Sequence, residues 1–68
     1  MGVDSVEAYR DPSGDWRWRY VHANGRIMAD SAEGYRRRGK CLDAVAYVLG
    51  LEDPHWVDED DCVRCYVA

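Results

Sequence analysis

Hydrophobic and polar residues alternate along the first half of the chain, and this alternation predicts β-strands. Residues 16–21 read WRWRYV, so their aromatic and basic side chains fall on opposite faces of an extended chain. Residues 6–11 and 26–31 have the composition of neighbouring strands. A turn at Pro12-Ser13-Gly14 and an Asn24-Gly25 pair separate the three segments. The pattern therefore predicts a three-stranded antiparallel meander after a flexible tail at residues 1–5.

The two turns also predict the register of the strands. A three-residue loop at 12–14 places Glu7 opposite Arg19, with Ala8 opposite Trp18 and Tyr9 opposite Arg17. A two-residue loop at Asn24-Gly25 places Arg19 opposite Asp30, with Tyr20 opposite Ala29 and His22 opposite Ile27.

This register gives the meander one apolar and one polar face. The apolar face, which a helix should cover, carries Val6, Ala8, Trp16, Trp18, Tyr20, Ile27 and Ala29. The polar face carries Glu7, Arg19 and Asp30 in a single row, and such a cross-strand ion row helps to specify the pairing.

The second half of the chain predicts one helix and one further strand. Residues 36–49 carry two adjacent apolar stripes, and Gly50 is suited to the left-handed position that ends a helix. The start of the helix has no side-chain cap. Residues 51–61 read as an acidic loop, and CVRCYV at residues 62–67 is typical of a strand. The expected architecture is a single α+β domain over residues 6–68, in the order β-β-β-α-β.

The residues that mark the meander also resemble a known family. GDWRWR at residues 14–19, followed by Asn24-Gly25, Ala29, Ser31 and EGY at residues 33–35, is similar to the signature of the YegP-like domains of unknown function. The resemblance covers about residues 6–49. It implies a β3-α-β unit that occurs as tandem repeats or as two subunits sharing one sheet and exchanging their C-terminal strands. Because this chain has one copy of the unit, the resemblance implies a homodimer.

The residues themselves favour the same assembly. A helix with two apolar stripes needs more cover than one face of a three-stranded sheet provides. A chain of 68 residues also buries little surface, and oligomerisation is one usual remedy. We therefore expect a dimer interface on the helix and the last strand, made by Leu42, Val45, Leu49, Val63, Cys65 and Val67.

Basic residues offer an alternative function in nucleic-acid binding. Arg17 faces Tyr9 with no acid directly opposite, and Arg36 and Arg37 lie at the uncapped helix start. These four residues form the candidate surface for nucleic acid or an acidic partner. The net charge of −4 weakens this reading, because phosphate-backbone binding usually relies on an excess of Lys and Arg. A solvated helix start and a structural strand are the simpler interpretation.

The three cysteines raise the question of a metal. Cys62 and Cys65 have CxxC spacing, but residues three apart in a strand point to opposite faces. A zinc site would also need Cys41 and His55 from distant segments, so buried thiols are the favoured interpretation and we expect neither metal nor cofactor.

No set of residues supports catalysis. Neither histidine has a neighbouring nucleophile or a suitably spaced carboxylate, so we expect a non-enzymatic protein. No apolar run approaches the length of a membrane span, so we expect a cytoplasmic location. The sequence thus predicts a small homodimeric interaction module with an unknown partner.

Overall fold

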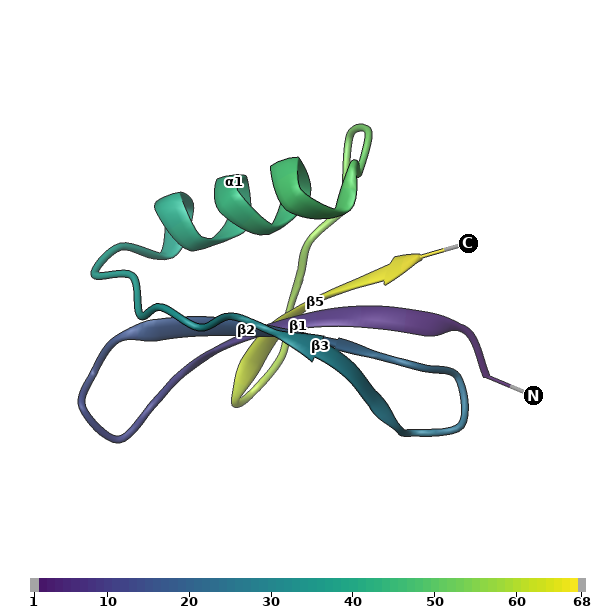
Figure 1. Cartoon of the computed structure of the whole chain (residues 1–68), viewed down its shortest axis with the longest axis horizontal. Coiled ribbons are helices and arrows are strands. Elements are labelled where there is room, and N and C mark those ends of the chain that lie inside the picture. Colours follow the sequence, from purple (N-terminus) through teal and green to yellow (C-terminus); the bar gives the residue numbers. More distant parts are fainter. Residues whose placement is uncertain (1, 68) are drawn as a thin grey trace.

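A computed structural model describes residues 2–67 of the chain. Five antiparallel strands form one sheet in the order β3-β2-β1-β5-β4, and a single helix lies across one of its faces (Figure 1). The elements are β1 (Asp4–Arg10), β2 (Trp16–Val21), β3 (Ile27–Asp30), α1 (Arg38–Leu49), β4 (Val57–Asp58) and β5 (Cys62–Val67). The predicted α+β class and the predicted order of the main elements are confirmed.

Several boundaries differ from the sequence prediction, and one short strand was missed. Asp4 and Ser5, expected in a flexible tail, belong to β1, and Ser5 is buried; Met1 lies outside the described residues. The helix begins at Arg38 rather than at residue 36. The acidic segment at residues 51–61, expected to be a loop throughout, contains the short strand β4, which pairs with β5 as a hairpin.

The first hairpin has the predicted register. Asp11 donates a backbone hydrogen bond to Asp15 and accepts one from Gly14, which closes a three-residue loop, and Gly14 takes a positive φ of 89°. Glu7 therefore pairs with Arg19 and Ala8 with Trp18. The turn chemistry alone was sufficient to align these two strands.

The loop of the second hairpin is one residue longer than predicted. His22 accepts a hydrogen bond from Gly25 and donates one to Arg26, so the loop spans residues 23–25 rather than two residues. A register shift beyond Tyr20 compensates for the longer loop, and Tyr20 still pairs with Ala29 as predicted. Ile27 pairs with Val21 instead of His22 and is 54% exposed, so the prediction that Ile27 lies on the apolar face is wrong.

The core lies between α1 and the central strands. Its fully or almost fully buried side chains come from β1, β2, α1 and β5. They are Val6, Ala8, Trp18, Cys41, Leu42, Val45 and Val63. Burying each of the larger aliphatic side chains contributes roughly 1.5–3 kcal/mol. The strand β5 supplies one of these residues and therefore completes the core of the single chain.

The helix α1 has a well-formed end and an uncapped start. Gly50 adopts a left-handed φ of 67°, and the amides of Gly50 and Leu51 donate to the carbonyls of Tyr47 and Ala46. These two bonds form a Schellman motif, and the left-handed Gly50 agrees with the sequence prediction. No side chain caps the helix start at Arg37, which also agrees with the sequence.

The last strand pairs with the first. Within the chain β5 runs antiparallel to β1, with Val6 opposite Cys65 and Ala8 opposite Val63. It reaches this place from α1 through residues 50–56, and together with β4 forms a hairpin at residues 57–67, called here the C-terminal hairpin. Exchange of this strand between two copies stays a prediction. No helix among the described residues is long and apolar enough to cross a membrane.

Candidate functional site

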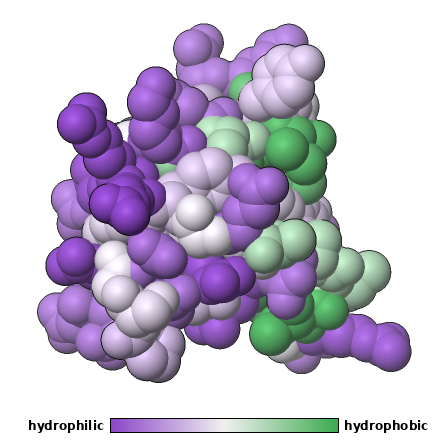
Figure 2. All heavy atoms as spheres, turned by 60° about the vertical axis from the view of Figure 1, so that its left-hand side comes forward, coloured by the Kyte–Doolittle hydropathy of each residue, from purple (hydrophilic) through white to green (hydrophobic). Residues whose placement is uncertain are grey.

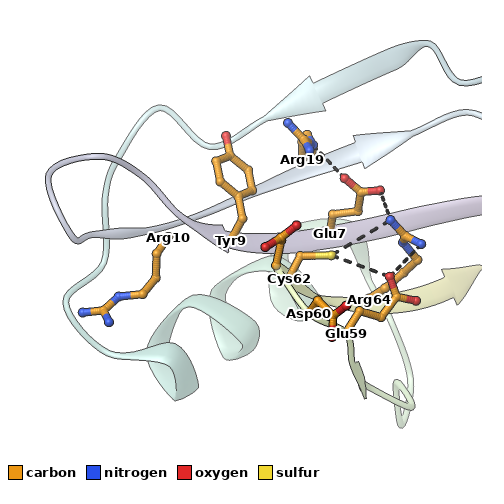
Figure 3. A pocket seen from close by; sticks show the side chains of 9 residues that line it. Glu7, Tyr9, Arg10, Arg19, Glu59, Asp60, Cys62 and Arg64 are labelled. Carbon is orange, nitrogen blue, oxygen red and sulfur yellow. Dashed lines mark hydrogen bonds and ion pairs between the residues drawn. The ribbon is translucent and has the colours of Figure 1, made fainter.

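The face of the sheet opposite α1, called here the outer face, carries a row of alternating charges. Glu7 stands at its centre, where its Oε1 accepts a hydrogen bond from Arg19 Nε at 2.8 Å and its Oε2 accepts one from Arg64 at 2.6 Å. Arg64 also pairs with Glu59 at 2.8 Å. The row therefore runs from β2 across β1 to the C-terminal hairpin (Figure 3).

Glu7 is unusual because it is buried although it lies on an open sheet face. Its side chain is 11% exposed. Burial raises the pKa of Glu7, but the hydrogen bonds and charges of Arg19 and Arg64 outweigh that effect and hold its pKa below the usual value. The carboxylate is thus charged near neutral pH and is neutralised from both sides.

The predicted binding residues on the sheet are already engaged within the chain. The Tyr9 ring stacks with the Arg19 guanidinium, 4.6 Å from the ring centre. Arg17 lies opposite Tyr9 as predicted, but its Nε donates to Asp11 Oδ2 at 2.7 Å, so Arg17 has an acidic partner although no acid lies directly opposite it. This hydrogen bond is the main reason that the pKa of Asp11 is lowered. The sequence reading missed Asp11 because this residue belongs to the turn and does not lie directly opposite Arg17.

The other two predicted binding residues lie elsewhere. Arg36 and Arg37 are exposed in the segment that leads into α1, on the side of the sheet that the helix covers. Within residues 2–67 neither of them makes an ion pair, whereas their neighbour Arg38 pairs with Asp58 at 2.7 Å. The four predicted residues therefore do not converge on one site.

A hollow of about 560 Å³ follows the charged row on the outer face. Figure 3 shows Tyr9, Arg19, Glu7 and Arg64 gathered along it, while Arg10 points away. Its lining comprises Glu7, Tyr9, Arg10, Arg19, Glu59, Asp60, Asp61, Cys62 and Arg64. The central acids and bases bind one another, and the arrangement mainly ties the C-terminal hairpin to β1.

The cysteines lie on both faces, as their spacing predicted. Cys65 pairs with Val6 and is buried toward the core, whereas Cys62 pairs with Tyr9 on the outer face and is partly exposed. Cys41 is buried in the helix, and its burial raises the pKa of the thiol to about 11. Within residues 2–67, no three His, Cys, Asp or Glu side chains come close enough to hold a metal ion.

The residues expected in a dimer interface pack inside the single chain. Leu42, Val45, Val63 and Cys65 are buried, whereas Leu49 and Val67 are partly buried against the same core. Other apolar side chains are left uncovered, among them Tyr47 at 89% exposure and Val48 at 62%. Figure 2 shows apolar residues gathered on one side of the molecule in two groups, one level with the helix and one level with the sheet.

Comparison with known proteins identifies a family. The family profile described as Domain of unknown function (DUF1508) matches residues 11–50, more than half of the chain. The matched region contains β2, β3 and α1 together with both hairpin loops of the meander. No curated protein and no solved structure matches the chain.

Proposed function

The chain belongs to the DUF1508 family, the group that its YegP-like motifs indicated, and from this premise we propose that it is a non-catalytic interaction module that acts as a homodimer. The proposed interface combines the exposed side of α1 with an exchanged C-terminal strand. The contacts that would join the subunits are apolar on the helix side of the sheet and charged on the outer face.

Uncovered surface is the observation that carries this proposal. The chain exposes 4955 Å², whereas a compact monomer of its mass exposes roughly 4,400 Å². The excess of roughly 550 Å² per chain gives roughly 1,100 Å² for two chains, which is just above the minimum of about 1,000 Å² for a biological interface. Tyr47 and Val48 lie side by side on α1 within this surface. In a dimer with a two-fold axis, this patch on one copy would contact the same patch on the other copy.

The position of β5 supports strand exchange. Its side chains Val63 and Cys65 contact the core, and those contacts are equally satisfied when β5 comes from a second chain. Only the connector at residues 50–56 must change its path. Asp53 within that connector has a positive φ of 46°, in the left-handed region that aspartate tolerates in turns.

Sedimentation equilibrium over a concentration range from about 1 to 100 μM tests the dimer. The wild-type chain should show twice its 7.8 kDa mass. Val48→Asp should weaken association at least tenfold, because it places a charge in an apolar contact. Ile27→Asp is the matched control, since Ile27 is similarly exposed but lies on β3, outside the proposed interface. A wild-type mass of 7.8 kDa throughout the range contradicts the proposal.

Nucleic-acid binding is the second candidate, and the exposed pair Arg36 and Arg37 favours it. These side chains lie at the start of a helix, where the helix dipole repels cations and attracts anions. A phosphate bound there would be stabilised by the two arginines and by the dipole. Titration of a labelled single-stranded oligonucleotide tests this candidate. Affinity should fall steeply between 50 and 200 mM salt, as phosphate contacts require. Equal binding by the parent and an Arg36→Ala, Arg37→Ala variant, or no binding by either, contradicts it.

A further inference from the structure

We propose that the Glu7–Arg64 pair is the specificity determinant of the assembly, because it selects β5 as the partner of β1 and fixes their register. This inference rests on the proposed dimer, in which Glu7 of one copy meets the C-terminal hairpin of the other. It adds to that proposal by naming the contact through which two copies recognise each other.

Each residue of the pair also contacts an oppositely charged residue on its own side of the contact. Arg19 on β2 holds the Glu7 carboxylate at 2.8 Å. Glu59, in the C-terminal hairpin, holds Arg64 at 2.8 Å. The 2.6 Å contact between Glu7 and Arg64 then joins the two units (Figure 3). Since both side chains are already oriented, forming this contact loses less conformational freedom than pairing two free side chains.

The charges of the two strands permit only one register. Arg64 is the single charged residue of β5, and Glu7 lies directly opposite it. A shift by two residues places Glu7 opposite Cys62 or Tyr66 and leaves Arg64 away from its carboxylate. A shift by one residue turns Val63 and Cys65 out of the core. Only the observed register satisfies both faces of β5.

An unpaired or like-charged partner at this contact is costly because both side chains are partly buried. Glu7 is 11% exposed and Arg64 is 27% exposed, so solvent screens the pair only partly. One other ion pair between the described residues links the C-terminal hairpin to the rest of the chain, namely Arg38 with Asp58. Its side chains are 44% and 79% exposed, so it contributes little to selectivity. The chain thus contains its own matched control.

Charge reversal tests the proposal. Glu7→Arg places a cation between Arg19 and Arg64, and Arg64→Glu places an anion between Glu7 and Glu59. Each variant alone should unfold at a lower urea concentration than the parent, because the like charges meet whether β5 pairs with its own chain or with the other. Mixing them should favour the heterodimer over the two homodimers by roughly 30-fold or more, since an exchanged heterodimer contains one native pair and one reversed pair, both of opposite charge. Native mass spectrometry of the mixture should show a one-to-one heterodimer.

Two controls make each outcome decisive. A single chain carrying both Glu7→Arg and Arg64→Glu should unfold at a higher urea concentration than either single variant but below the parent, because the pair is restored while Arg19 and Glu59 still face like charges. A mixture of Arg38→Asp and Asp58→Arg chains should favour its heterodimer less than about threefold. The inference is overturned if the mixture of Glu7→Arg and Arg64→Glu chains gives no excess of heterodimer, or if the double variant is no more stable than either single variant. In each of these cases the parent remains a dimer, whereas a monomeric parent overturns the proposed function itself.

Discussion

Two glycines bracket the start and end of α1, and the same substitution at each should move stability in opposite directions. Gly39 lies in the first turn of the helix, and a Cβ added there meets nothing within 4 Å. Alanine is favoured over glycine in a helix by up to about 1 kcal/mol, so Gly39→Ala should stabilise the fold by about 0.5–1 kcal/mol. Gly50 has a left-handed φ of 67°, where a side chain costs roughly 1–2 kcal/mol, and Gly50→Ala should therefore destabilise it.

Thermal unfolding followed by circular dichroism measures both changes. At one chain concentration, each 1 kcal/mol corresponds to a shift in Tm of roughly 4–8 °C for a domain of this size. The Gly39→Ala variant should melt above the parent and the Gly50→Ala variant below it, with similar helical signals when folded. Two shifts of the same sign would refute this reasoning. A loss of stability in Gly39→Ala would mean that the helix does not begin before residue 39.

Three further predictions follow from burial and charge. In a urea titration, Val45→Ala should lower the free energy of unfolding by about 2–3 kcal/mol, because truncating this fully buried side chain leaves a cavity. Val57→Ala on β4, an exposed position, should lower it by less than about 0.5 kcal/mol. Because the folded-state pKa of Glu7 is depressed, the stabilisation from Glu7 is complete above the ordinary pKa of 4.5 and is lost as pH falls through and below that value. In this acidic range the stability of Glu7→Gln should vary less with pH than that of the parent. An equally steep profile would contradict the lowered pKa of Glu7. A thiol reagent at pH 8 should modify the partly exposed Cys62 first and reach Cys41 only through unfolding, since the Cys41 thiol is buried with its pKa raised to about 11; rapid labelling of Cys41 in the native chain would contradict the packing of α1.

The meander was the most predictable part of the fold because two independent signals specified it. The Pro-Ser-Gly turn and the alternation of β2 agree on the pairing of Glu7 with Arg19. The second hairpin shows the limit of such reasoning. An Asn-Gly pair predicts a tight loop, but the type of turn depends on the residue before it, and a bulge absorbed the difference near Ile27. β4 was missed because two residues within an acidic segment carry no recognisable strand period.

The charged row was only half predictable. Glu7 and Arg19 follow from the register of one hairpin, but Arg64 joins them from 57 positions along the chain. That contact depends on which strand β5 pairs with, and local patterns do not specify a partner strand. The lone charge in CVRCYV was the available signal, because a charged residue at an interior strand position usually has a counter-charge opposite. Arg17 was misread for the opposite reason, since its partner Asp11 lies diagonally in the turn.

Strand exchange between two copies is the central claim, and isotope-filtered NMR tests it most directly. A dimer refolded from equal amounts of labelled and unlabelled chain reports only the contacts that pass from one chain to the other. The account predicts such contacts between Val6 and Cys65 and between Ala8 and Val63, the facing residues of β1 and β5. If these contacts arise only within one chain, β5 is not exchanged and the claim is wrong.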